Sequence, residues 1–294
     1  MRLVIDRRRP RAPLVLACAL LLAGCSAPAS PDDGRIHIVA STNVYGDIAA
    51  AIGGDLVEVT SIVSDPAQDP HSVDGSARVQ LALSKADIVI TNGGGYDDWA
   101  DILLAGAGND DATVINVTEI SGYDTTEGFN EHLWYDFPTV QKLAAALQAE
   151  IGARADWPLN STEFADALAE LQAREAAMAA AGHETAVAIT EPVPLYLLAA
   201  SGFTNVTPDA FSEAIEEGSD VPPAALRDTL ALVTDGTARL LVYNEQTTSP
   251  ETEQVKAAAI AARVAVVPMS ETLPNGYSYL EWMATNLAAL EELS

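Results

Sequence analysis

Strand-like and helix-like segments alternate along most of this chain, and that alternation is the strongest constraint on its fold. In the first half, apolar and β-branched runs predict strands over residues 36–40, 57–63, 87–91 and 113–117, and the segments between them predict helices over 45–52, 76–85 and 96–105. Strands that alternate with helices pair in parallel through right-handed crossovers. The first half therefore predicts a parallel sheet flanked by helices.

The second half repeats the pattern. It predicts strands over residues 186–190, 204–207, 239–243 and 264–267, and helices over 192–201, 222–234, 250–262 and 277–293. Between the halves, residues 139–155 and 161–181 are dense in Ala, Leu, Glu and Gln, and a helix of about 20 residues spans roughly 30 Å. We predict an α/β fold with two similar lobes, each a parallel sheet flanked by helices, joined by a long helix.

The amino terminus has the pattern of an export signal. Five arginines precede the apolar run Pro13–Ala23, which leads into Leu22-Ala23-Gly24-Cys25. That run is too short to span a bilayer as a mature helix, which takes about 20 residues. Its ending resembles the bacterial lipobox, which implies cleavage before Cys25 and lipidation of the Cys25 thiol; ordinary secretory cleavage nearby is the alternative. We predict a signal peptide at 1–24, a lipidated tether at 25–34, an N-terminal lobe at 35–155, a connecting helix at 156–184 and a C-terminal lobe at 185–294.

Cysteine content and charge limit the chemistry of the mature chain. The sequence contains only Cys18 and Cys25, so a mature chain that starts at Cys25 has no internal disulfide and no thiolate metal site. The whole chain carries a formal charge of −27, and loss of residues 1–24 leaves 10 basic and 41 acidic residues, a charge of −31. This charge argues against nucleic acid and against binding to anionic lipid by charge. Any metal must therefore bind through nitrogen and oxygen ligands.

Two of the four histidines lie in loops that precede predicted helices. His71 follows Asp69-Pro70 in a strand-to-helix loop, a position where ligands bind in α/β folds. Proline stiffens this loop, and Ser76 is a predicted cap of the next helix. His132 lies in Asn130-Glu131-His132-Leu133-Trp134, beside aromatic residues that suggest a partly closed pocket wall. A histidine paired with a nearby aspartate, or one packed in an aromatic core, is the plainer interpretation of each segment alone.

The other two histidines and a run of three glycines are not expected to form binding sites. His37 lies inside a predicted strand, and His183 follows a glycine at a predicted helix end, where a cation helps to cap the terminus. The run Gly93–Gly95 lacks the spacing of a dinucleotide fingerprint and has no following Lys-Ser/Thr. We predict that this run is a tight turn before the next helix.

Together the two histidine segments resemble signature segments of the solute-binding proteins of zinc and manganese ABC importers. The resemblance also includes Ala40-Ser41, Ile52-Gly53-Gly54-Asp55 and the order of strands and helices in both halves. It implies that a metal ion sits between two lobes joined by a long helix, held by one residue from each of four loops. The first two ligands of the family match His71 and His132.

The resemblance implies a third ligand at Glu191, where the family has His or Glu just after the first strand of the second lobe. The family's fourth ligand is often an aspartate after a later strand, and residues 243–250 contain none. Gln246 is the substitute that we expect, with Glu245, Thr248 and water as alternatives. A glutamate in place of a third nitrogen favours harder ions such as manganese, whereas zinc generally binds nitrogen and oxygen sites more tightly. The expected cargo is therefore Zn2+ or Mn2+.

These features predict an extracytoplasmic lipoprotein, anchored to the cell membrane, that captures a divalent transition metal and delivers it to an ABC permease. Catalysis, nucleic acid binding and oligomerisation are not expected. Two alternatives use the same residues: a two-lobed receptor for a small organic solute, and a secreted metalloenzyme in which the ion activates water. Elemental analysis separates the first alternative, and hydrolytic or redox turnover separates the second.

Overall fold

The computed structural model describes residues 34–65, 68, 70–126, 128–155, 162–182 and 185–293. The predicted signal peptide, Cys25 and nearly all of the predicted tether lie outside the described residues, as do Asp69 and His183. From Gly34 onward, contacts group the chain into one compact unit. None of the helices in the described ranges is long and apolar enough to cross a membrane.

The first sheet has four parallel strands in the order β2-β1-β3-β4. They are β1 (Ile36–Thr42), β2 (Val57–Val63), β3 (Ile88–Thr91) and β4 (Thr113–Asn116). The helices between and after them are α1 (Asn43–Gly53), η1 (Gly54–Leu56), α2 (Ala77–Leu83), α3 (Asp98–Ala107) and α4 (Val117–Ser121). The strands and longer helices predicted for this half are confirmed.

The second sheet repeats this topology, with four parallel strands in the order β6-β5-β7-β8. Its strands are β5 (Ala186–Ile189), β6 (Thr204–Asn205), β7 (Leu240–Asn244) and β8 (Ala265–Met269). Its helices are α7 (Leu195–Ala200), α8 (Asp209–Glu216), α9 (Pro223–Thr234), α10 (Pro250–Ala262) and α11 (Tyr279–Glu291). The α/β fold with two parallel sheets flanked by helices is therefore confirmed.

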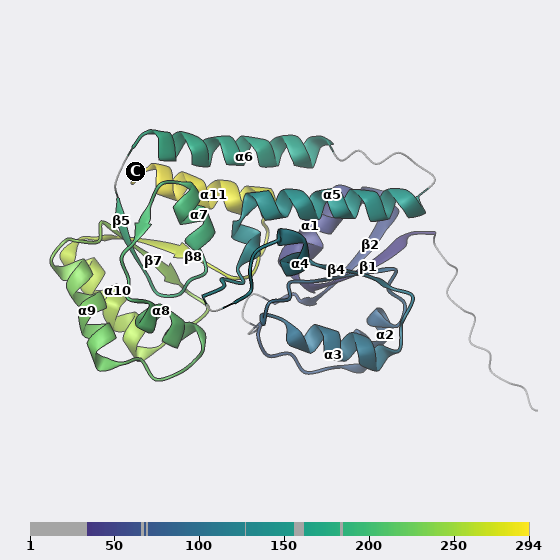
Figure 1. Ribbon diagram of the computed structural model, residues 1–294, viewed down its shortest axis with the longest axis horizontal. Helices are drawn as coiled ribbons and strands as arrows, with labels where there is room; N and C mark the ends of the chain where they lie inside the picture. The colour runs from purple at the N-terminus through teal and green to yellow at the C-terminus, as the bar shows by residue number, and fades with distance from the viewer. Residues whose placement is uncertain are drawn as a thin grey trace, which may run out of the picture. The chain divides into compact units, whose positions relative to one another are not determined.

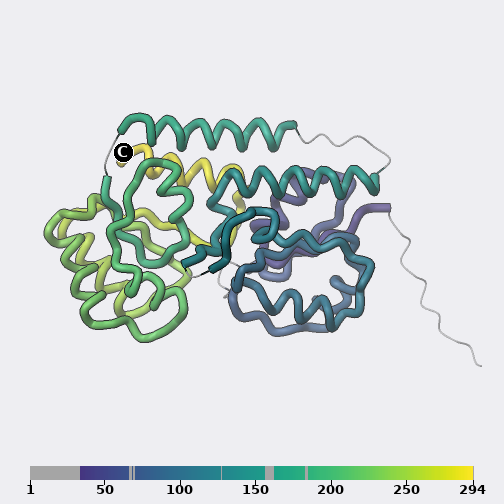
Figure 2. Tube along the Cα trace, in the orientation of Figure 1, coloured from purple at the N-terminus to yellow at the C-terminus, as the bar shows by residue number. Residues whose placement is uncertain are grey.

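Three long helices connect the two sheets. After η2 (Leu133–Tyr135), the chain forms α5 (Phe137–Arg154) and then α6 (Thr162–Ala180). Helix α6 contacts α5, α7 and α11, and Figure 1 shows it running along both α5 and α11. The same path can be followed along the trace in Figure 2, from teal α5 to yellow α11. The helical segments predicted over residues 139–155, 161–181 and 277–293 are therefore present as α5, α6 and α11.

Alternating side chains explain why helices cover both faces of each sheet. In β1, Ile38 and Ala40 belong to the main apolar core, whereas Val39 between them packs with residues of α2 and α3. In β7, Leu240 and Val242 face the same main core, whereas Leu241 and Tyr243 pack under α8, α9 and α10. Parallel strands that are buried on both faces read as continuous apolar runs, as these do.

The main core is continuous between the two sheets. Tyr279 of α11 donates a hydrogen bond from its hydroxyl to the carbonyl oxygen of Trp134 at 2.7 Å. Its ring stacks against Phe164 of α6 at 6.4 Å between centroids. All three side chains are almost completely buried, and burying an aromatic side chain of this size contributes about 1.5–3 kcal/mol. These contacts favour a fixed connection between the sheets over a loose hinge.

Two short helices, α4 and α8, were not predicted from the sequence. In α8 the apolar residues Phe211, Ala214 and Ile215 are buried at helical spacing, so the pattern was present but short. Strand β6 is shorter than predicted, because Thr207 turns its hydroxyl to accept from the Ile189 amide at 2.8 Å. The predicted cap at Ser76 is confirmed, since its hydroxyl accepts from the Val79 amide at 3.2 Å.

The loops that follow the carboxyl ends of the strands lie where ligands bind in folds of this kind. In each sheet the order reverses beside the first strand, so the carboxyl ends of β1 and β3, and of β5 and β7, form switch points where ligands bind in such folds. The predicted tight turn at Gly93–Gly95 follows β3, with φ angles of 71°, 66° and 101°. The φ of 71° at Gly93 lies in the left-handed region that favours glycine, and a Cβ there would also lie 2.4 Å from the side-chain nitrogen of Asn116.

Candidate metal centre

The two predicted histidines converge. His71 lies between β2 and α2, and Nε1 of Trp99 donates to the carbonyl of Pro70 at 2.9 Å, which fixes the loop. His132 lies just before η2 and is fully buried. The ring of Tyr96 contacts both imidazoles edge-on, at 4.6 Å from His71 and 5.9 Å from His132. Two imidazoles that are 61 positions apart in sequence therefore share one aromatic wall.

A hydrogen-bond network fixes which nitrogen of His132 faces the site. Nδ1 of His132 lies 2.7 Å from the side-chain oxygen of Asn130. The other end of that amide donates to the carbonyl of Pro192 at 3.0 Å, so its oxygen must face His132. Because this oxygen only accepts, Nδ1 carries a proton, and Nε2 is the ring nitrogen that faces the site. Nε2 is buried and has no hydrogen-bond partner among the described residues.

Two glutamates meet the imidazoles. Oε2 of Glu271 lies 3.3 Å from Nε2 of His71. Oε1 of Glu216 lies 3.5 Å from the same nitrogen and 3.4 Å from Nε2 of His132. His132, Glu216 and Glu271 form a group whose ligand atoms lie within 4.8 Å of one another, and His71 joins this cluster through its contacts with both glutamates. Glu131, on the outer side, forms a second such group with His71 and Glu216.

The third predicted residue, Glu191, lies beside the cluster. It follows β5 by two residues, as Glu271 follows β8, and both carboxyl groups are buried. The side-chain nitrogen of Asn244, the last residue of β7, donates to Glu191 and also to Glu271 at 2.8 Å. Glu191 is not among the groups closest to the imidazoles. Asn244 therefore bridges two carboxyl groups at the carboxyl ends of three strands.

The fourth predicted residue, Gln246, supports the loop of Glu271. Its side-chain oxygen accepts from the backbone amide of Glu271 at 2.7 Å and from that of Thr272 at 3.2 Å. Its side-chain nitrogen donates to the hydroxyl of Thr272 at 2.6 Å. The side chain of Gln246 is thus directed at the backbone of the Glu271 loop, and Glu245 is in neither group of histidine and acidic ligands found among the described residues.

Burial and charge act on the ionisable groups here. Burial lowers the pKa of His71, but the carboxyl groups of Glu216 and Glu271 outweigh it and raise the pKa to about 10. Burial raises the pKa of Glu191 to about 8, and the charges of Glu216 and Glu271 act in the same direction. Burial also opposes ionisation of Glu271, but its contact with His71 and the charges of both histidines lower its pKa. The cluster thus favours a positive charge between the carboxylates.

Glu271 and Glu216 were missed from the sequence, for different reasons. The fourth ligand was expected within residues 243–250, at Gln246, whereas the structure places an acidic residue near the imidazoles after β8, at Glu271. The available signal was its position two residues after the end of β8, a strand that was predicted. Glu216 ends α8, a helix that was not predicted, so its position carried no signal.

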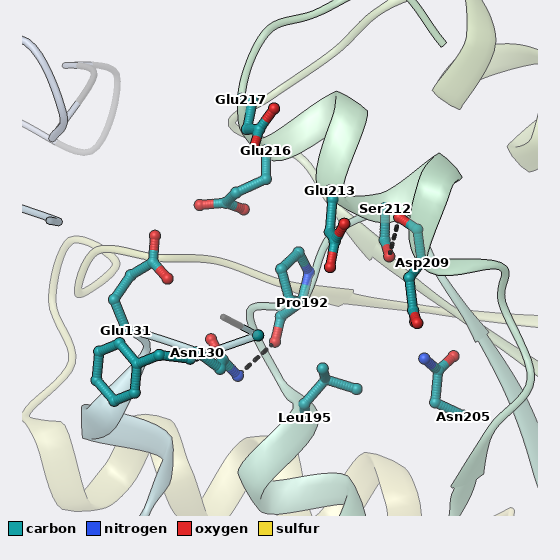
Figure 3. A pocket seen from close by; sticks show the side chains of 12 residues that line it. Asn130, Glu131, Pro192, Leu195, Asn205, Asp209, Ser212, Glu213, Glu216 and Glu217 are labelled. Carbon is teal, nitrogen blue, oxygen red and sulfur yellow. Dashed lines mark hydrogen bonds between the residues drawn. The ribbon is translucent and has the colours of Figure 1, made fainter. Parts of the chain in front are cut away.

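An acidic cavity of about 760 Å³ opens beside the cluster. Glu131 and the acidic residues of α8 and its end line it, including Glu213, Glu216 and Glu217. In Figure 3, the carboxyl groups of Glu216 and Glu131 point toward the same space, and their oxygens lie within 4.8 Å of each other. Carboxylates at this density attract cations toward the imidazoles.

Relatives and solved structures share this architecture. A stretch of 142 residues is 27% identical to the manganese-binding lipoprotein MntA of Halalkalibacterium halodurans. The stretch covers 47% of this chain and 47% of MntA, so the chain matches about half the length of that relative. FpvC of Pseudomonas aeruginosa, solved in complex with Mn2+, aligns at a TM-score of 0.69 and 20% identity over 88% of this chain and 98% of its own. The periplasmic zinc-binding protein TroA of Treponema pallidum aligns at 0.68 and 16% over 88% and 99%. At these identities, the solved structures show the fold.

A family model covers nearly the whole described chain. It is the model of ZnuA, the periplasmic component A of a zinc-uptake complex, and it matches residues 38–293. That span contains all of both sheets except the first two residues of β1, together with the linking helices and every residue of the cluster. The chain therefore belongs to the ZnuA family of zinc-uptake complex components.

Proposed function

We propose that this protein captures a divalent transition metal, Zn2+ or Mn2+, outside the cytoplasm and delivers it to an ABC permease. One observation carries the proposal: the Glu271 carboxylate, which follows a strand of the opposite sheet, lies 3.3 Å from Nε2 of His71 and forms a potential metal-binding group with His132 and Glu216. Membership of an uptake family supports transport over catalysis. The manganese and zinc named for the similar proteins support the class of cargo.

The spacing of the atoms supports a metal ion. Zinc binds imidazole nitrogen and carboxylate oxygen at about 2.0–2.2 Å, so two ligands at a tetrahedral angle lie about 3.4 Å apart. Nε2 of His71 and Oε2 of Glu271 lie 3.3 Å apart. Ordinary N–H···O hydrogen bonds have a mode of about 2.9–3.0 Å. The observed spacing therefore matches two neighbouring ligands of one ion.

We propose direct ligation by His71, His132 and Glu271. Glu191 supplies a further carboxylate at the edge of the site, where Asn244 joins it to Glu271. Gln246 orients the loop of Glu271 through two backbone amides. Two imidazoles and carboxylates suit a divalent transition metal and disfavour Ca2+, which prefers a shell of oxygens alone.

We also propose that the protein is a lipoprotein held at the membrane through Cys25. The sequence motif Leu22-Ala23-Gly24-Cys25 and the lipoprotein name of the relative support this. The Cys25→Ser variant is expected to move from the membrane fraction to the soluble fraction. Retention of this variant in the membrane fraction would contradict lipid anchoring.

Thermal melting of the metal-stripped protein tests the proposed cargo. At a free metal concentration about 100 times Kd, binding adds about 2.7 kcal/mol of stability, which corresponds to a rise in Tm of about 5–10 °C for a chain of this size. His71→Ala is expected to remove most of that rise. His37→Ala is the matched control, since His37 lies in β1 and pairs with Glu58 at 3.9 Å. An unchanged rise in His71→Ala would refute the proposed site.

A further inference from the structure

Glu216 is a buried carboxylate whose contacts in the fold do not account for its position. Its side chain is 10% exposed. Neither oxygen has a hydrogen-bond partner among the described residues. Leaving a buried charged acceptor without a partner costs about 1–3 kcal/mol or more. The contacts that offset this cost among the described residues are those with the imidazoles of His71 and His132.

The local electrostatics make the cost larger. Glu216 is the last residue of α8, where the partial negative charge of the helix end disfavours a carboxylate. Its charge also acts on Glu191, and Glu131 lies within 4.8 Å of it on the outer side. Among the described residues, Glu216 forms ion pairs only with the two histidines. A cation beside the Glu216 carboxylate would offset the repulsion among these carboxylates and the negative charge of the helix end.

The distances from Glu216 to the imidazoles fit such a cation. Oε1 of Glu216 lies 3.5 Å from Nε2 of His71 and 3.4 Å from Nε2 of His132. Both values match the separation of about 3.4 Å expected between neighbouring ligands of a tetrahedral ion. Glu216 thus has the same relation to both imidazoles that Glu271 has to His71 at 3.3 Å.

We propose that Glu216 is a direct ligand of the captured metal ion, supplied by α8 in addition to the carboxylates that follow β5 and β8. This inference rests on the proposed function. It makes α8 part of the binding site, since the ion would link the end of that helix to His71 and His132 of the first half of the chain. The cargo is then held by two imidazoles and by carboxylates from two separate elements of the second half.

A pair of matched variants tests the proposal. Glu216→Gln removes the charge and keeps the size of the side chain. Glu213→Gln makes the same change one turn earlier, at an exposed residue of α8 that lines the same cavity but is not in either group of potential ligands. Competition titration of each metal-stripped variant with Mn2+ and with Zn2+ gives the affinities, and far-UV circular dichroism verifies that both variants are folded.

Glu216→Gln is expected to weaken binding of either metal by about tenfold or more, comparable to the loss on removing a group that supports a metal site. Glu213→Gln should change affinity by less than about threefold, because it alters only the electrostatic potential in the cavity. Equal affinities in the two variants would overturn the proposal. If His71→Ala abolishes binding in the same assay, that outcome refutes Glu216 as a ligand and leaves the proposed cargo intact.

Crystals soaked with Mn2+ give an independent measure. The anomalous peak is expected about 2.0–2.2 Å from an oxygen of Glu216, the distance typical of carboxylate ligands. A peak beside His71 and His132 with both Glu216 oxygens more than about 3 Å away would overturn the proposal, because that separation is too long for a bond between metal and oxygen.

Discussion

Asn130 holds the His132 imidazole through a hydrogen bond of 2.7 Å between its side-chain oxygen and Nδ1. The same residue reaches the loop after β5, where its amide nitrogen donates to the Pro192 carbonyl at 3.0 Å. The hydroxyl of Tyr196 in α7 donates to the Asn130 backbone oxygen at 2.8 Å. The orientation of His132 therefore depends on contacts with the second half of the chain, and His132 is oriented before any ion arrives.

Asn130→Ala is expected to lower metal affinity by about 10–100-fold, because groups that orient a metal-binding histidine contribute that much. Asn130→Asp keeps an acceptor for Nδ1 and should lose less. Competition titration with Zn2+ or Mn2+ checks the order of the two variants. Wild-type affinity in Asn130→Ala would show that the hydrogen bond does not support binding.

Asn244→Asp should destabilise the metal-free protein by about 1–3 kcal/mol, because it replaces a bridging donor by a third carboxylate beside Glu191 and Glu271. Added metal should restore more stability than it adds to the wild type. Thermal melts with chelator and with metal measure both effects. Asn275→Asp makes the same charge change at an exposed residue, and equal metal-free Tm values for the two variants would contradict the expected role of Asn244.

Glu175 of α6 predicts a pH-dependent stability. Burial raises its pKa from 4.5 to about 8, and the charge of Asp136 adds to the effect. Between these values, the folded state binds more protons than the unfolded state, so the free energy of unfolding falls as pH rises. Glu175→Gln should flatten this fall and stabilise the protein by about 1–3 kcal/mol near pH 8.5, with little effect near pH 4.

Urea unfolding of Glu175→Gln across this pH range is the measurement. Glu170→Gln is the control, since Glu170 lies exposed on the same helix. If both variants retain the wild-type slope of stability against pH, Glu175 is not the group responsible.

Leu147→Ala should separate stability from binding. Leu147 of α5 is fully buried in the main core between the sheets, and removing such a side chain costs about 2–5 kcal/mol. The metal-induced rise in Tm should persist, because the substitution leaves the cluster untouched. The exposed Gln141→Ala on the same helix should stay within about 0.5 kcal/mol of the wild type. Loss of the metal-induced rise in folded Leu147→Ala would show that core packing controls the site.

The spacing of apolar residues predicted most of the fold, because in strands and long helices this spacing reflects which faces of the element are buried. Residues of β1 and β7 are apolar on both faces, and the positions of Pro250 and Ser76 mark helix starts that the structure contains. The short helix α8 has 8 residues and three buried apolar side chains. It is too short to show the repeated helical spacing that identifies longer helices from sequence. Its position was decided by packing over β5 and β7, which involves residues distant in sequence.

The sequence by itself determined the two parallel sheets, the helical link and the pair of loops that carry His71 and His132, because each depends on neighbouring residues. Only the tertiary structure decided which acidic groups meet those imidazoles. Glu271 and Glu216 arrive from a strand end and a helix end, whereas Gln246 turns to the backbone of the Glu271 loop. Among 42 acidic residues, proximity in three dimensions, which local pattern does not encode, selects the few that can bind one ion.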